Sequence, residues 1–91
     1  SMSNIDPFVA IADPHRRHLL EALRRAPKTV NELASGLPIS RPAVSQHLKA
    51  LLDCNLVTVT SEGTRRIYSV NRPGFASTFG LTSSGLNVRP R

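Results

Sequence analysis

Hydrophobic residues between about Pro14 and Ala26 recur at the spacing of an amphipathic helix, because three leucines fall along one face: Leu19, Leu20 and Leu23. Asp13 before Pro14 supplies a capping carboxylate followed by a residue suited to the first helical position, and Pro27 ends the segment. Asp6-Pro7 repeats this signal ahead of a short apolar stretch from Phe8 to about Ala12. The pattern therefore predicts a short helix followed by a longer one.

A second pair of helices is predicted between residues 29 and 54. Thr29-Val-Asn-Glu32 matches a capping box, in which the hydroxyl and the carboxylate each satisfy a free amide at the start of a helix. This helix covers about Val30 to Ser35, and Gly36-Leu37-Pro38 forces a turn after it. Ser40 is the expected N-cap of the next helix, about Arg41 to Cys54.

The helix from Arg41 has two different faces. An i, i+4, i+7, i+8 spacing directs one set of apolar residues inward: Val44, Leu48, Leu51 and Leu52. The other face is polar, with Arg41, Ser45 and Lys49 in a row and Pro42 and Gln46 beside them. Because Pro42 has no amide, the Ser40 side chain would have to accept from the amide of Ala43.

The next segment changes from a helical to an alternating pattern. Asn55 can adopt the left-handed conformation that ends a helix, and Leu56 to Thr60 then alternates apolar and polar residues. Glu62-Gly63 supplies a turn, and Arg65 to Val70 returns as a second strand. The chain is thus predicted to be mainly α-helical with a small β-hairpin, as in a winged helix-turn-helix.

The polar face of the fourth helix carries the candidate chemistry. Gln46 could contact adenine through a bidentate amide, Arg41 or Lys49 could meet guanine or a phosphate, and Ser45 could bond to either. Arg65 and Arg66 point to opposite faces of a strand, so at least one of them is free to reach DNA. The alternatives are an ordinary solvated helix face and charged residues that protect an exposed strand edge.

Charge and composition favour a polyanionic partner without proving one. The 91 residues carry a formal net charge of +6, and residues 72–91 contribute three arginines and no acid. A single cysteine, Cys54, favours an intracellular, cytoplasmic location, and no apolar run approaches a membrane-spanning length. We expect a DNA-binding domain over residues 5–71 and a basic C-terminal tail, containing Gly and Ser, over residues 72–91.

The chain lacks the residue clusters of a metal site or an enzyme. His15 and His18 could share one helix face and His47 and Cys54 another, but a zinc site needs three or four protein ligands and neither pair is completed. No phosphate-binding glycine loop, nucleophile elbow or pair of catalytic acids is visible. The sequence therefore predicts no metal, no cofactor and no catalysis.

From Ile11 to Val70 the chain resembles the ArsR family of bacterial winged-helix transcriptional repressors, through the words IADPHRRHLLEAL, VNELASGLPISRPAVSQHLKALLDCNLV and EGTRRIYSV. The resemblance implies a homodimer that binds a palindromic operator and blocks transcription. By position, the DNA-binding role passes to Ser40, Arg41, Pro42, Ser45, Gln46 and Lys49 in the major groove. Arg65 and Arg66 take the role of the wing.

Three departures from the family pattern matter. The cysteine pair that metal-sensing members carry is absent from VNELASGL, and the tail offers no His and Asp ligands, so the inducer stays unassigned. Thr64 stands where the family often has Arg, which would weaken one phosphate contact. The tail is a poor substitute for the family's apolar dimerisation helix. Dimerisation would then depend on Phe8, Val9 and Ile11, with Phe75, Phe79 and Leu81 as further candidates.

A second hypothesis is a protein-interaction module, because winged helices also serve as docking folds and a fold does not fix a function. The irregular basic tail would then be the docking element. Under this hypothesis DNA affinity would not depend on Gln46, which distinguishes it from a sequence-specific DNA-binding protein.

Overall fold

The computed structural model of the protein describes residues 6–79. Its first two helices are α1 (Pro7–Ala10) and α2 (Pro14–Arg25), and an aspartate caps each of them. The Asp6 carboxylate accepts the amide of Phe8 at 2.8 Å, and the Asp13 carboxylate accepts the amides of His15 at 2.7 Å and Arg16 at 3.3 Å. Both predicted helices are confirmed, and each ends slightly earlier than expected.

The capping signals of the second pair of helices are also confirmed. Thr29 and Glu32 form both hydrogen bonds of the capping box at the start of α3 (Val30–Ser35). The Ser40 hydroxyl accepts the amide of Ala43 at 3.2 Å, which starts α4 (Arg41–Asp53) as predicted. Asn55 ends the helical segment with a φ of 65°.

Three antiparallel strands form a small sheet in the order β1-β3-β2. β2 (Val57–Glu62) and β3 (Arg65–Val70) make the predicted hairpin, with Gly63 at a φ of 64° in the turn. β1 (Lys28–Thr29) pairs with Tyr68 and Ile67 of β3 and was not predicted. A strand of two residues is too short for an alternating pattern to indicate it, and only its position beside β3 defines it.

The C-terminal part corrects one expectation. Residues 72–91 are expected to form an irregular basic tail, yet the tail begins with α5 (Arg72–Phe79), a helix of 8 residues. The Asn71 side-chain amide precedes it and donates to the main-chain oxygen and the Oδ1 of Asn55, at 3.0 and 3.1 Å. Phe75 and Phe79 belong to α5, whereas Leu81 lies outside the described residues. A contact between segments sixteen residues apart thus holds the beginning of a helix whose own propensity is weak.

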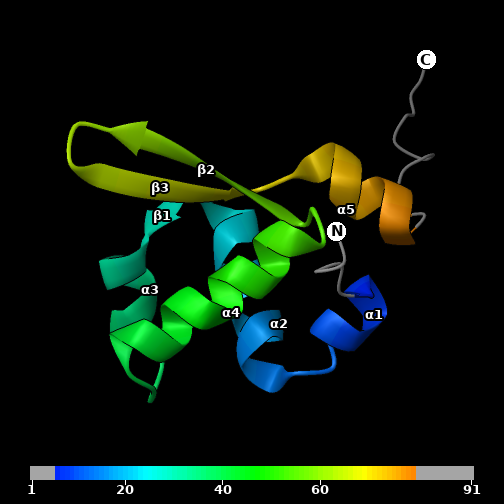
Figure 1. Ribbon diagram of the computed structural model, residues 1–91, viewed down its shortest axis with the longest axis horizontal. Helices are drawn as coiled ribbons and strands as arrows, with labels where there is room; N and C mark the ends of the chain where they lie inside the picture. The colour runs from blue at the N-terminus through cyan, green and yellow to red at the C-terminus, as the bar shows by residue number, and fades with distance from the viewer. Residues whose placement is uncertain (1–5, 80–91) are drawn as a thin grey trace.

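The helices and the sheet share one core, in which α4 contacts α1, α2, α3 and β2. Its largest fully buried side chains are Leu19, Leu48, Leu51, Leu56, Val44 and Val57. The tip of the hairpin extends beyond α3 at one end of the molecule, while α1 and α5 lie together at the opposite end (Figure 1). Among residues 6–79, no helix combines the length and the apolar character needed to cross a membrane.

Candidate nucleic-acid interface

The two predicted faces of α4 are present in the structure. Val44, Leu48 and Leu51 are fully buried and Leu52 is half-buried, so the apolar face lies against the core. On the opposite face Arg41, Pro42, Gln46 and Lys49 are exposed, and Ser45 is half-buried. The burial of one face therefore fixes the direction in which the polar face points.

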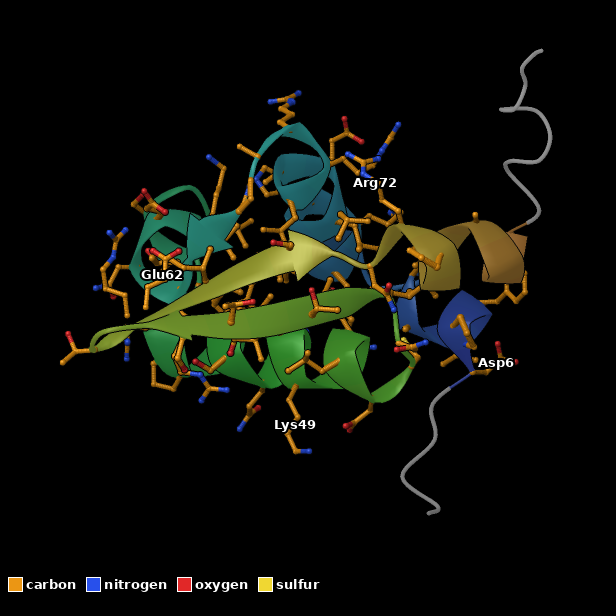
Figure 2. All side chains as sticks on the ribbon, turned by 90° about the horizontal axis from the view of Figure 1, so that it is seen from above. Asp6, Lys49, Glu62 and Arg72 are labelled. Carbon is orange, nitrogen blue, oxygen red and sulfur yellow. The ribbon has the colours of Figure 1, made fainter. Side chains whose placement is uncertain are left out.

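Most of the polar groups on this face remain available to a ligand. Within the described residues, the side chains of Ser45 and Gln46 form no hydrogen bond, and Ser40 still has its hydroxyl hydrogen to donate after accepting from Ala43. The Lys49 ammonium lies 3.5 Å from a carboxylate oxygen of Asp53, with 74% of the lysine side chain exposed. Figure 2 shows Lys49 projecting outward from α4. Because exposed pairs of this kind contribute little, Lys49 can exchange Asp53 for a phosphate at small cost.

The hairpin presents both of its arginines to solvent. Arg65 is paired in register with Glu62 and Arg66 with Ser61, at the end of the hairpin next to the turn. Neither arginine forms a salt bridge within residues 6–79, with Glu62 or with any other acid. Both guanidinium groups are exposed and can reach a ligand beside the hairpin.

A hollow of about 320 Å³ lies where the wing approaches the helix-turn-helix. We call it the arginine pocket, and its lining residues are Thr29, Val30, Asn31, Arg41, Thr64, Arg65 and Arg66. The Nε of Arg41 donates to the Oδ1 of Asn31 at 2.6 Å, which ties the first residue of α4 to α3. Sequence reasoning missed Asn31, because its role depends on a contact between two helices and no local pattern indicates it.

Glu32 lies near the arginine pocket, and its own hydrogen bonds to Thr29 already engage it. The hydrogen bond from the Thr29 amide, together with the nearby charges of Lys28 and Arg65, lowers the pKa of Glu32. The same Glu32 oxygen accepts from the Thr29 amide at 2.8 Å and from the Thr29 hydroxyl at 3.3 Å. Glu32 therefore serves the helix cap rather than neutralising an arginine directly.

Arg16 and His47 contact each other beside the polar face of α4. The Nε of Arg16 donates to the Nδ1 of His47 at 3.1 Å, and the Arg16 guanidinium also donates to the Ala10 oxygen at 3.4 Å. The His15 ring lies near His47, with ring centroids 5.7 Å apart. These contacts join α1 and α2 to the middle of α4, so Arg16 and His47 help to hold the helix rather than extend its polar face.

Residues 6–79 contain no group of three or more metal-ligating side chains that could hold an ion. Cys54 is buried, its thiol lies 3.6 Å from the Leu51 oxygen, and burial raises the pKa of this thiol. A buried thiol with a raised pKa is a space-filling group rather than a reactive one.

The sequence pattern of bacterial regulatory proteins of the arsR family matches residues 13–59, from the start of α2 into β2. The chain belongs to this family. It is 50% identical over 68 residues to the HTH-type transcriptional regulator Rv2034 of Mycobacterium tuberculosis, a match that covers 75% of this chain and 64% of that relative. It is 41% identical over 69 residues to a probable mercury resistance operon repressor of Streptomyces lividans, covering 76% of this chain and 55% of the relative. The chain thus spans less than two thirds of the length of these two relatives.

Solved structures agree with this family membership. A possible transcriptional regulator for arsenical resistance superposes with a TM-score of 0.79 at 39% identity, covering 88% of this chain and 83% of its own. The homodimeric winged helix-turn-helix DNA-binding domain of Mb0332 from Mycobacterium bovis superposes with a TM-score of 0.70 at 29% identity, covering 79% of this chain and 67% of its own. These matches confirm the predicted winged helix-turn-helix fold, and the family consists of transcriptional regulators rather than enzymes.

Proposed function

We propose that this ArsR-family protein is a repressor that acts as a homodimer on a palindromic DNA operator, with α4 in the major groove. The observation that carries the proposal is the division of α4 into an apolar face that packs against the core and a polar face that is largely exposed. A helix presented in this way fits the width of the major groove. The relative from Streptomyces lividans is itself described as a probable operon repressor, which supports the sense of the regulation.

Each exposed side chain has a role that follows from its chemistry. Gln46 discriminates between bases because its amide can both accept from and donate to adenine. Ser40, Pro42 and Ser45 lie beside the groove wall, where the hydroxyls donate to phosphates or base edges. The cationic groups neutralise phosphates and act regardless of sequence: Arg41, Lys49, Arg65 and Arg66.

The homodimer is supported by the arrangement of the two ends of the molecule. Phe8 and Val9 of α1 are 58% and 60% exposed, and α5 lies at the same end, opposite the tip of the hairpin (Figure 1). Two copies that join at this end bury apolar surface and leave both wings pointing outward. Ile11, the third residue expected at the interface, is half-buried and packs against the core, so it supports α1 from within. The structurally similar domain of Mb0332 from Mycobacterium bovis is a homodimer.

A titration of fluorescently labelled DNA taken from around the protein's own gene tests DNA recognition. We expect a sequence-selective complex that weakens steeply with salt, since each neutralised phosphate contributes a slope of about −0.9 in log K against log salt. Gln46→Ala should cost about 1–3 kcal/mol of discrimination between operator and scrambled DNA. Lys49→Ala should instead weaken binding to both duplexes alike. The absence of a salt-sensitive, sequence-selective complex at micromolar protein would contradict the proposal.

A mass measurement in solution tests the dimer. The wild-type protein should sediment as a dimer, and Val9→Glu should shift it towards the monomer because the new carboxylate would lose its water at the interface. Glu21→Ala, an exposed change on α2, is the matched control and should leave the mass unchanged. In the dimer the two copies of α4 should lie about 34 Å apart. A wild-type protein that remains monomeric at every concentration tested would overturn this arrangement.

A further inference from the structure

We infer that the arginine pocket is a binding site for one phosphate of the DNA backbone, and that Asn31 is the residue that positions Arg41 for it. The inference rests on the proposed function, since it assigns a further contact to the same DNA complex. It adds a residue of α3 to an interface that otherwise consists of α4 and the hairpin.

The pocket brings cations from two separate parts of the chain to one place. Arg41 comes from the start of α4, whereas Arg65 and Arg66 come from the hairpin, and all three line the same hollow of about 320 Å³. None of them forms a salt bridge within the described residues. Like charges gathered in one hollow, with no salt bridge to an acid among residues 6–79, favour an anion between them.

The hydrogen bond to Asn31 orients Arg41 without using its charge. Asn31 is neutral and accepts only from Nε, so neither terminal nitrogen of the guanidinium has a hydrogen-bond partner among residues 6–79. These two nitrogens form the planar fork that binds two oxygens of a phosphate at once. Since an exposed arginine otherwise samples many rotamers, fixing Nε lowers the entropy that binding must remove.

The ligand is a phosphodiester because of where the pocket lies. The pocket is open and lies between the start of α4 and the hairpin. The sugar-phosphate backbone of the DNA must pass there if α4 and the hairpin contact neighbouring grooves. Thr64, at the turn of the hairpin, also lines the pocket and adds a neutral hydroxyl donor. Thr64 stands at the wing position where the family often has an arginine. Arg41 of α4 lines the same pocket and thus supplies a phosphate contact next to that position.

A salt titration of operator binding tests the role of Asn31. Asn31→Ala should weaken binding about three- to tenfold for operator and scrambled DNA alike, and should reduce the salt slope by about 1 per protomer. Asn31→Ser, which also removes the acceptor from the reach of Arg41, should give the same loss. Ser35→Ala, an exposed change at the other end of α3, is the matched control and should change neither quantity.

A double-mutant cycle separates positioning from other effects. If Asn31 acts through Arg41, then Asn31→Ala should have no further effect in a protein that already carries Arg41→Ala. An unchanged slope in Asn31→Ala, or a full additional loss in the double variant, would overturn the inference while leaving wild-type DNA binding intact. A wild-type protein without salt-dependent binding would instead refute the proposed function on which the inference rests.

Discussion

The two ends of this molecule are built in opposite ways. The reading end, formed by α3, the first turns of α4 and the tip of the hairpin, is polar and cationic, and a capping residue close in sequence starts each of its helices. The α1–α5 end exposes Phe8 and Val9 and is held by contacts between distant segments, such as the one from Asn71 to Asn55. The contrast shows how one small domain can offer a charged surface to DNA and an apolar surface to a second copy, provided that one rigid core joins them.

Leu48→Ala tests whether the two ends depend on the same core. Leu48 is fully buried on α4, so the change should lower the free energy of unfolding by about 2–5 kcal/mol. Urea unfolding should remain a single transition in which DNA binding and dimerisation are lost together. Lys49→Ala, at the neighbouring exposed position, should change stability by less than about 0.5 kcal/mol. Two separate unfolding steps would show that the ends are independent.

Gly74→Ala acts on the α1–α5 end alone. A Cβ atom at Gly74 would overlap the main-chain oxygen of Asn55, so the start of α5 would have to move. We expect a loss of about 1–3 kcal/mol and faster hydrogen exchange of the Asn71 amide, which donates to the Leu56 oxygen at 2.9 Å. Gly36→Ala is the matched change at the reading end, where a Cβ would meet only ordinary contacts, and should be tolerated. Equal effects of the two substitutions would mean that the α1–α5 end and the reading end tolerate a Cβ atom equally well.

Removing a helix cap from each region should give smaller and similar losses of stability. Asp13→Ala removes the cap of α2, and Thr29→Ala removes the capping box of α3 at the reading end. Each should lower the free energy of unfolding by about 1 kcal/mol. A loss of more than about twice this value in only one of them would mean that the cap also carries tertiary contacts.

The pH dependence of stability follows from the same two caps. Desolvation raises the pKa of Asp13, but hydrogen bonds from the His15 and Arg16 amides and the nearby charges of His47 and Arg16 outweigh it, so the net shift is downward. The pKa of Glu32 is lowered as well. A carboxylate with a depressed folded pKa stabilises the protein above its unfolded pKa, about 4, and this contribution is lost as the pH falls. Urea midpoints should therefore decrease between pH 5 and pH 2, and less so in Asp13→Ala.

The smallest effect is expected at a surface pair on α2 that lies outside both contact surfaces. The guanidinium of Arg24 lies 3.1 Å from the Glu21 carboxylate, and both side chains are more than half exposed. Arg24→Ala should change the unfolding midpoint by an amount equivalent to less than about 0.5 kcal/mol and should alter neither DNA affinity nor mass. A larger change in DNA affinity would extend the contact surface onto α2.

Local patterns in the sequence were sufficient for most of the reading end. The Thr29–Glu32 capping box, the Ser40 cap and the alternation after Asn55 placed the start of α3, the start of α4 and the hairpin near their observed positions. These signals succeed because each of them acts over three or four residues. The spacing of Val44, Leu48 and Leu51 likewise predicted which face of α4 is buried, since a helix has a fixed period.

The sequence by itself determined the first four helices, the hairpin, the polar face of α4 and the family. Only the tertiary structure decided that Arg16 binds His47, that Asn31 holds Arg41, and that α5 forms beside Asn55. These features join residues that are ten to thirty-one positions apart along the chain. No local propensity encodes such contacts, because they exist only after burial of the leucine face of α4 has fixed the positions of the surrounding helices.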